Sequence, residues 1–213
     1  MESKTVGLWV DIVNNPNEEF REYFQAEESY LKAALSKGMV VLDIGCGDGR
    51  SMKPVSRLVK SFIGIDNDKN AIKAFNENMK DVKNAEVILE DAEGTGFKDR
   101  TFDVVFIGLT FCNFGETKQR VLSEIRRILK DGGKFILSVY SEDAFDSRTQ
   151  MYDKIKLDYK ILDELKGMVQ FKDGAVSEQF SMKDMKRMLA EAGFVITGAQ
   201  SGSIFHIISA KKL

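Results

Sequence analysis

The chain has 213 residues, and its 31 Lys and Arg side chains nearly balance 33 Asp and Glu, which leaves a net charge of -2. This balance argues against a nucleic-acid binder that relies on a broad basic surface, although it leaves room for a local basic patch. The two cysteines, Cys46 and Cys112, have no metal-ligand spacing and provide no disulfide framework, so we expect a reducing cytoplasm. No apolar run reaches about 18 residues, and no membrane span is expected.

Residues 1–38 carry large aromatic side chains at spacings that favour an amphipathic helix ending near Gly38. The apolar positions are Phe20, Tyr23, Phe24, Tyr30 and Leu31. Such a stripe most often packs a helix onto the core of a protein. A second interpretation is a lid that closes over the glycine turn described next.

The stretch from residue 40 to 50 (VVLDIGCGDGR) reads as a strand, a tight turn and the start of a helix. Glycines at 45 and 47 permit positive φ and remove the Cβ that would hold a ligand away, so backbone N–H groups can meet a polar ligand. A dinucleotide loop has the pattern G-x-G-x-x-G, and here Arg50 stands where the third glycine belongs. The turn is therefore a candidate cradle for a small molecule.

Strands and helices alternate from the glycine turn to residue 140. We predict helices over 51–60, 71–80 and 116–130, and strands over 61–65, 85–90, 102–107 and 134–140. Pro54 is tolerated because it lies near a first helical turn, and Gly132 with Gly133 ends the helix before the last of these strands. This alternation predicts a parallel sheet covered by helices on both faces.

The pattern changes between residues 141 and 180, where we expect a helical insertion beside the ligand face. Its amphipathic segment contains Ile155, Leu157, Ile161, Leu162 and Leu165. A helix predicted over 181–192 is followed by two strands, 194–199 and 204–210, joined by four residues. Such a short link is a hairpin connection, so the last two strands must be antiparallel.

Acidic side chains follow two of the predicted strands. Asp66 comes 21 positions after Gly45, about the spacing at which a carboxylate accepts hydrogen bonds from ribose hydroxyls. Asp91 ends the next strand, and ligands of open α/β sheets bind beyond such carboxyl ends. The missing third glycine departs from the dinucleotide fingerprint. The terminal hairpin does not continue the chain as a second mononucleotide-binding half, so a dinucleotide enzyme is disfavoured.

Taken together, these residues resemble the class I S-adenosylmethionine-dependent methyltransferases, closely over residues 38–140 and more loosely over 181–210. The resemblance implies a Rossmann-like, doubly wound α/β fold with a seven-stranded sheet, mostly parallel, in which the last strand is antiparallel. We expect a single domain over residues 1–213. Residues 1–38 would form its N-terminal helical lid, and residues 141–180 its helical insertion near the substrate site.

The resemblance also implies which residues bind the cofactor, S-adenosylmethionine, and its product S-adenosylhomocysteine. Residues 41–49 match the loop that wraps the methionine portion, and Asp66 matches the residue that holds both ribose hydroxyls. Asp91 matches the hydrogen-bond partner of the adenine amino group, and Leu109 a main-chain contact near the methionine amino group. The full set is Asp43, Gly45, Cys46, Gly47, Asp66, Asn67, Asp91, Ala92 and Leu109.

Candidate substrate-pocket residues are Tyr23, Tyr30, Cys112, Asn113, Tyr140 and Tyr152. Cys112 is not preceded by proline, as cytosine-C5 methylation would require, which favours a buried structural thiol. His206 is expected to be structural, and the sequence offers neither a histidine base near the cofactor nor a metal triad. Asp91 has a plainer interpretation as an Asx-turn residue.

We expect methyl transfer to an N or O atom of a small molecule by direct displacement, with no catalytic residue assigned. One alternative is a methyltransferase for RNA or protein, since a helical insertion can form a docking surface. Another is a protein that binds the cofactor without turnover. The chain is expected to act as a monomer or homodimer, without a membrane partner.

Overall fold

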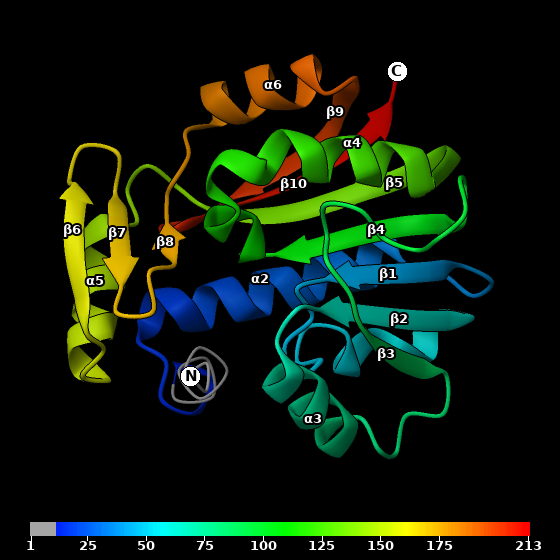
Figure 1. The fold of residues 1–213 in the computed structure, drawn as a ribbon, viewed down its shortest axis with the longest axis horizontal. Helices are drawn as coiled ribbons and strands as arrows, with labels where there is room; N and C mark the ends of the chain where they lie inside the picture. The colour runs from blue at the N-terminus through cyan, green and yellow to red at the C-terminus, as the bar shows by residue number, and fades with distance from the viewer. Residues whose placement is uncertain (1–11) are drawn as a thin grey trace.

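The computed structural model describes residues 12–213, and its centre is a seven-stranded sheet in the order β3-β2-β1-β4-β5-β10-β9 (Figure 1). The strands from β3 to β5 pair in parallel, whereas β10 is antiparallel to both β5 and β9. The predicted doubly wound sheet with an antiparallel last strand is confirmed. The strands are β1 (Val40–Ile44), β2 (Ser61–Asp66), β3 (Ala85–Leu89), β4 (Phe102–Gly108), β5 (Leu129–Tyr140), β9 (Phe194–Ser201) and β10 (Phe205–Lys212).

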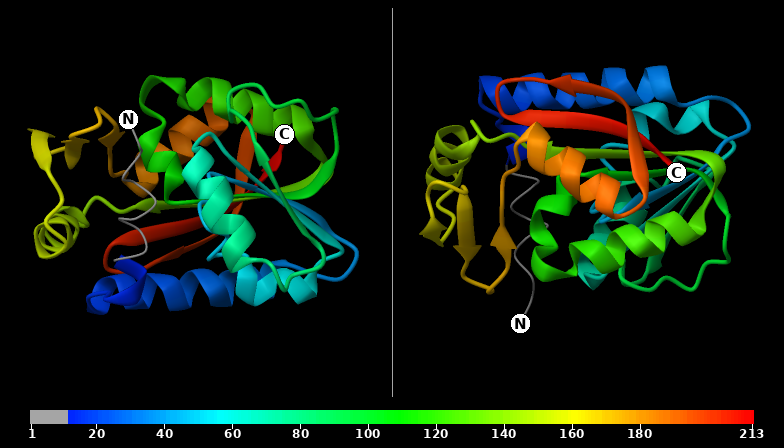
Figure 2. Two further views of the ribbon diagram at one scale, coloured as in Figure 1. Left: turned by 60° about the horizontal axis from the view of Figure 1, so that its bottom comes forward. Right: turned by 90° about the horizontal axis from the view of Figure 1, so that it is seen from above.

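Helices cover both faces of this sheet, as the alternating sequence pattern predicts (Figure 2). Helix α2 (Glu18–Ala34) and the 3-10 helix η1 (Lys53–Leu58) lie on one face, and α4 (Lys118–Ile128) and α6 (Met182–Glu191) lie on the other. Helix α3 (Lys69–Asn78) packs against β2 and β3. The strand order reverses between β1 and β4, which is where open α/β sheets bind ligands.

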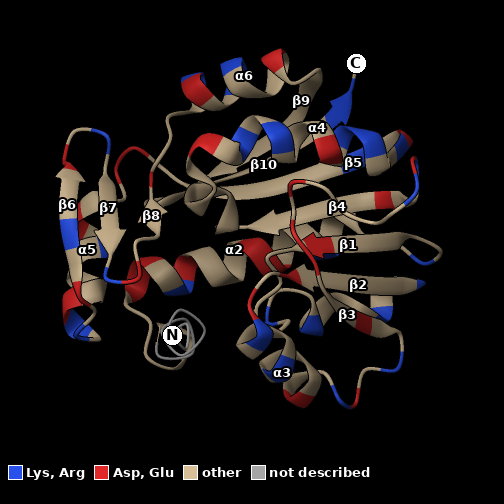
Figure 3. Cartoon of the chain, viewed as in Figure 1, with Lys and Arg blue, Asp and Glu red and all other residues tan. Residues whose placement is uncertain are grey.

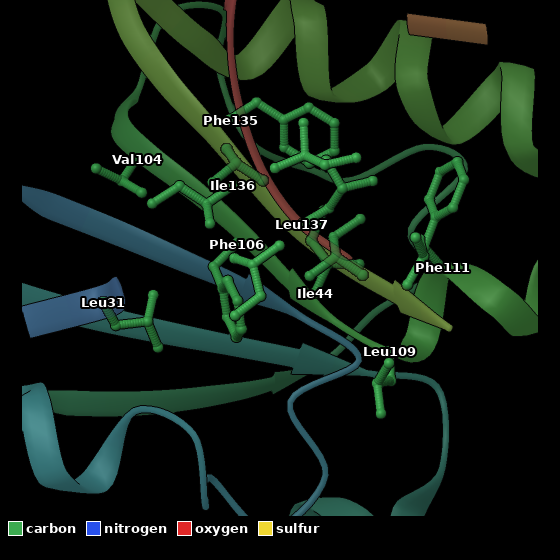
Figure 4. Packing of buried hydrophobic residues seen from close by; sticks show 14 of the residues in the cluster. Leu31, Ile44, Val104, Phe106, Leu109, Phe111, Phe135, Ile136 and Leu137 are labelled. Atoms are coloured by element: carbon green, nitrogen blue, oxygen red, sulfur yellow. The ribbon is translucent and has the colours of Figure 1, made fainter. Parts of the chain in front are cut away.

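The core lies between β4, β5 and the helices around them (Figure 4). Val105 and Ile107 on β4 are buried beside Phe135 and Leu137 on β5, whereas Val104 and Phe106 are buried on the opposite face of the sheet. Their strands read as nearly continuous apolar runs because both faces of the sheet are covered. This buried layer holds the carboxyl ends of β1 and β4 in fixed positions.

Helix α2 is a packed layer of the fold over residues 18–34. Asn17 caps it by accepting a hydrogen bond of 3.0 Å from the N–H of Phe20. Phe20, Tyr23 and Leu31 are fully buried, and the Tyr23 ring lies 5.4 Å from that of Phe205 on β10. The packed-helix interpretation therefore describes α2 well. Residues 1–11 of the predicted lid lie outside the described residues.

The predicted helix over residues 51–60 is wrong in type and length, because only η1 forms there. The N–H of Lys53 donates to the carbonyl of Gly49, at 3.0 Å, but Pro54 has no N–H with which to continue that pattern. Val55 instead donates to the carbonyl of Met52, at 3.1 Å. The segment tightens into a single 3-10 helix before β2 begins.

The predicted helical insertion over 141–180 needs a similar correction. It holds one helix, α5 (Phe145–Lys154), followed by a small antiparallel sheet of β6 (Tyr159–Asp163), β7 (Met168–Phe171) and β8 (Val176–Ser177). Lys156 has φ 55, which ends the helical conformation, and Leu165 lies almost fully exposed in the β6–β7 turn. The apolar spacing there does not mark a buried helix face. The small sheet lies beyond the carboxyl ends of β4 and β5 (Figure 1).

Figure 3 shows Lys and Arg interspersed with Asp and Glu over the described helices and loops. This distribution matches the nearly balanced charge of the sequence. None of the helices in residues 12–213 is long and apolar enough to cross a membrane.

Candidate functional site

The glycine turn follows β1 and is hydrogen-bonded to the end of the neighbouring strand β2. Gly45 and Gly47 have φ of 68 and 54, and the N–H groups of Gly45 and Cys46 both donate to the carbonyl of Ile65, at 2.8 and 3.0 Å. A Cβ on Gly45 would lie 2.3 Å from Cγ2 of Thr110, whereas a Cβ on Gly47 would meet no protein atom within 4 Å. The turn is therefore closed by protein at Gly45 and open at Gly47, as a ligand cradle requires.

A cavity of about 520 Å³ opens at the carboxyl ends of β1, β2, β3 and β4. Its volume is in the range of pockets that hold cofactors or small ligands. Ten of the residues singled out from the sequence line it: Gly45, Cys46, Gly47, Asp66, Asn67, Asp91, Ala92, Leu109, Tyr23 and Asn113. The structure thus brings together residues that are dispersed between positions 23 and 113.

Two carboxylates beside the glycine turn are directed by backbone hydrogen bonds. Asp66 accepts from the N–H of Gly47 at 3.1 Å and from the N–H of Asp68 at 3.0 Å, one bond on each oxygen. Burial raises the pKa of Asp66, an effect opposed by these bonds. Asp68 caps α3 with one oxygen, and its Oδ2 is buried without a hydrogen-bond partner among the described residues. Both side chains can accept further hydrogen bonds from a ligand.

Asp91 at the end of β3 adopts the Asx turn that the sequence allowed. Its Oδ1 accepts from the N–H of Glu93 at 2.8 Å, which leaves Oδ2 available to a ligand. Asp91 is exposed, and Ala92 beside it is half-buried. The turn and a ligand contact are thus compatible at this residue.

Leu109 follows β4 in a left-handed conformation, with φ 51, that non-glycine residues seldom adopt. Its N–H donates both to the carbonyl of Ser138, at 3.1 Å, and to the Ser138 hydroxyl, at 3.0 Å. Such strain persists only where surrounding structure enforces it, and it gathers at functional sites. The backbone of Leu109 is held at the cavity wall in this way.

Asp43 is placed differently from the prediction, because it does not line the cavity. It is buried on β1, where burial and the nearby Glu27 carboxylate raise its pKa. Cys46 does line the cavity, but burial raises the pKa of its thiol far above the ordinary range. Neither group is presented as a reactive side chain at the cavity wall.

Four of the substrate-pocket candidates do not line this cavity: Tyr30, Cys112, Tyr140 and Tyr152. The Tyr30 hydroxyl donates to Ser209 on β10 at 2.8 Å. Cys112 is fully buried, and burial raises the pKa of its thiol to about 11. The buried Arg148 guanidinium carbon lies 4.3 Å from the centre of the Tyr140 ring and 5.9 Å from that of Tyr152. Their aromatic surface serves the packing of α5 on the sheet.

Sequence reasoning missed Arg50 and its partner Glu27. Arg50 lines the cavity, and its Nη2 donates to Oε2 of Glu27, at 2.8 Å. The hydroxyl of Ser51 donates to the same carboxylate oxygen, at 2.8 Å. The signal in the sequence was the arginine in the third glycine position, which was read only as a departure from the dinucleotide motif.

His206 lies on β10, away from the cavity, as expected. Its Nδ1 is 2.7 Å from the hydroxyl of Ser201 and its Nε2 is 2.9 Å from Oε2 of Glu142. Among residues 12–213, no cluster of three histidine, cysteine or acidic side chains is arranged to hold a metal ion.

Comparison with known proteins agrees with this geometry. A family model described as a methyltransferase domain matches residues 42–137, from the glycine strand to β5. An uncharacterized protein of Methanocaldococcus jannaschii is 32% identical over 171 residues, which cover 80% of this chain and 71% of the relative. The chain belongs to the class I S-adenosylmethionine-dependent methyltransferases.

Two further comparisons extend this result. The demethylmenaquinone methyltransferase of Staphylococcus aureus is 29% identical to this methyltransferase over 170 residues, which cover 75% of this chain and 69% of that enzyme. The crystal structure of an S-adenosylmethionine-dependent methyltransferase from Aquifex aeolicus superposes with a TM-score of 0.70 at 18% identity and covers 96% of this chain and 98% of that one. The cofactor of this methyltransferase is S-adenosylmethionine.

Proposed function

We propose that this methyltransferase transfers the methyl group to an N or O atom of a neutral small molecule by direct displacement. The observation that carries the proposal is the chemistry of the cavity wall between β4 and the small sheet. The cavity residues between the end of β4 and the small sheet have uncharged side chains, namely Asn113, Phe114, Thr117 and Ala175, and so does Tyr23 on α2. Such a wall fits a partly apolar, uncharged acceptor that needs one or two hydrogen bonds for orientation.

The cavity fits the cofactor at its other end. The orphaned Oδ2 of Asp68 and the free lone pairs of Asp66 can accept hydrogen bonds from ribose hydroxyls. The open space beside Gly47 allows a ligand to approach the backbone. We assign Asp91 to the adenine amino group, with Asn67 and Ala92 beside the ring. The backbone of the glycine turn and of Leu109 then faces the amino-acid portion.

The residues of the cavity contribute mainly by positioning the cofactor and the acceptor. The bound cofactor supplies a methyl group activated on a sulfonium sulfur. The cavity wall orients the acceptor so that a lone pair lies in line with that methyl at about 3–3.5 Å, and closure of the site excludes water. Neither cysteine acts as a nucleophile, because both thiols are buried and both pKa values are raised by burial.

A carbon acceptor is a second candidate. The Staphylococcus aureus relative is named a demethylmenaquinone methyltransferase, a name that indicates a quinone-type acceptor. A methyltransferase for RNA is less favoured because Arg50 is the sole cation among the described residues that line the cavity. Protein substrates and binding without turnover remain outcomes of the experiment below.

The test follows the label from S-adenosylmethionine tritiated in its methyl group. The purified protein is incubated with small-molecule, RNA and protein fractions of a cell extract, and each fraction is then counted. We expect the label in the small-molecule fraction, and NMR of the product shows whether nitrogen, oxygen or carbon carries the methyl. Label in RNA or protein overturns the proposal. Tight cofactor binding with no label in any fraction favours the non-catalytic alternative.

A further inference from the structure

Arg50 is the single cationic side chain among the described residues that line the cavity. The same wall carries six carboxylates: Asp48, Asp66, Asp68, Glu90, Asp91 and Glu93. Like charges repel strongly in a partly buried site. A ligand that brings its own carboxylate into this cavity therefore finds one favourable place for it, beside Arg50.

Glu27 on α2 fixes the position of this guanidinium. The Glu27 side chain is only 2% exposed, and its Oε2 accepts from Nη2 of Arg50 at 2.8 Å. The guanidinium carbon also lies 4.4 Å from the centre of the Phe24 ring, in a cation–π contact. Because an unpaired buried carboxylate is costly, this ion pair is retained strongly. Arg50 is thus held by two residues of one helix.

The guanidinium keeps donors for a ligand. Its Nη2 serves Glu27 and the Ser51 hydroxyl, while Nε and Nη1 have no hydrogen-bond partner within residues 12–213. The side chain is 26% exposed, and it lines the cavity. Arginine presents its N–H groups in a rigid fork that matches the two oxygens of a carboxylate.

The position of Arg50 along the cavity indicates which carboxylate it meets. A Cβ on Gly108 would lie 3.0 Å from Oε1 of Glu27, so the Glu27–Arg50 pair lies beside the end of β4. Asp66 and Asp91 lie at the ends of β2 and β3, on the other side of β1. If adenosine occupies β2 and β3, the amino-acid tail of the cofactor extends toward β4 and Arg50.

We propose that Arg50 binds the carboxylate of the cofactor's amino-acid portion and that Glu27 is the positioning residue that holds Arg50 for it. This rests on the proposed function only in placing adenosine at Asp66 and Asp91. Helix α2 then belongs to the cofactor site, although Glu27 itself is buried behind Arg50.

The same carboxylate also supports the strained turn at Leu109. The Tyr23 hydroxyl donates to Oε1 of Glu27 and lies 2.8 Å from the hydroxyl of Ser138. Ser138 in turn accepts from the N–H of Leu109 at 3.0 Å. A continuous chain of hydrogen bonds therefore joins Glu27 to the cavity wall on β4, so that one residue of α2 supports two walls of the site.

The test compares two ligands by calorimetric titration. S-Adenosylhomocysteine carries the carboxylate, and its decarboxylated analogue keeps the adenosine, the sulfur and the amino group. We expect Arg50→Gln to weaken binding of S-adenosylhomocysteine roughly 10- to 100-fold, the range for a lost charged hydrogen-bonded pair. The affinity for the analogue should change less than about threefold, since it never contacts Arg50.

Glu27→Gln tests the positioning role. It should weaken binding of S-adenosylhomocysteine in the same carboxylate-dependent manner but to a smaller extent, because Arg50 keeps its charge and loses its fixed place. The double variant Glu27→Gln with Arg50→Gln removes both charges together, so it leaves no unpaired buried charge if a single variant folds poorly. Glu28→Gln is the matched control, because Glu28 is exposed on the same helix and pairs with Lys32.

Equal losses for the two ligands, or no loss for either, overturn the proposal. Failure of the proposed function has a different signature, in which both ligands bind normally but no small molecule receives the methyl group. An effect of Arg50→Gln on acceptor binding alone would assign the guanidinium to the acceptor and would also refute the inference.

Discussion

The N–H of Gly47 donates a hydrogen bond of 3.1 Å to Oδ2 of Asp66, which ties the glycine turn of β1 to the end of β2. The bond orients a partly buried carboxylate before a ligand arrives. It also means that the orientation of the Asp66 carboxylate depends on the conformation of the glycine turn.

Asp66→Ala should weaken binding of S-adenosylhomocysteine by about 1.5–3 kcal/mol, the range for hydrogen bonds to a charged group. The loss should apply equally to the decarboxylated analogue, because both ligands carry the ribose. Asp81→Ala, at an exposed position after α3, is the control. Calorimetry that shows unchanged affinity in a folded Asp66→Ala protein refutes the ribose assignment.

The pH dependence of binding should follow Asp66. Burial raises its pKa above the ordinary 3.8, so acidification protonates this group before an ordinary aspartate. The protonated form accepts hydrogen bonds poorly, and affinity should therefore fall as the pH falls through the raised pKa. In Asp66→Asn this dependence should disappear. A fall that persists unchanged in that variant would place the titrating group elsewhere.

Gly47→Val should abolish cofactor binding more thoroughly than it destabilises the fold. Its Cβ would point into open space where the ligand approaches the backbone. Gly38→Val is a matched control, because Gly38 also has positive φ and free space around it but lies outside the cavity. Both variants should lower the melting temperature through backbone strain, and only Gly47→Val should lose the cofactor. Equal binding by both would make the turn purely structural.

Cys112→Ala should keep methyl transfer and lose about 1 kcal/mol of stability, as is usual for a small buried truncation. The reason is that Cys112 is fully buried outside the cavity, where its Sγ accepts from the N–H of Tyr140 at 3.3 Å. Cys112 should react with a thiol reagent only after the protein unfolds. Loss of turnover with cofactor binding intact would instead show that this thiol takes part in the reaction.

Hydrogen exchange should divide the predicted lid into two parts. Amides between Phe20 and Leu31 should be protected without ligand, because α2 is packed and capped. Residues 12–14 should gain protection when S-adenosylhomocysteine binds, since Val13 and Asn14 line the cavity. Ligand-induced protection spread over all of α2 would show that the whole helix closes over the site.

Much of the fold could be predicted because its signals are local. The alternation of apolar runs and helical patterns indicates a parallel sheet, and the four-residue link before Ile204 can only be a hairpin. Asp66 and Asp91 could be grouped because parallel strands place their carboxyl ends at one edge. These inferences need only the spacing of residue types along the chain and the direction of the strands, and both can be obtained from the sequence.

The parts of the site that could not be predicted from the sequence depend on the direction in which each side chain points. Tyr23 and Tyr30 lie on the same helix, yet the first lines the cavity and the second bonds to Ser209. Aromatic spacing predicts burial without distinguishing core from cavity. Glu27 and Arg50 are far apart in the sequence, and only the packing of α2 brings them into contact. Gly167 and Gly174, both with positive φ, were the available sign of hairpin turns in the small sheet.

The place of β10 between β5 and β9 has a consequence for biosynthesis. Every cavity residue before position 118 leaves the ribosome well before residues 205–212, yet β10 must insert between β5 and β9. Its Phe205 and Ser209 are also the partners of Tyr23 and Tyr30 on α2. A nascent chain that has already produced the glycine turn therefore lacks these two contacts of α2 until the last strand emerges, and release of the chain before residue 205 yields a protein that has the cavity residues but an incomplete sheet beneath α2.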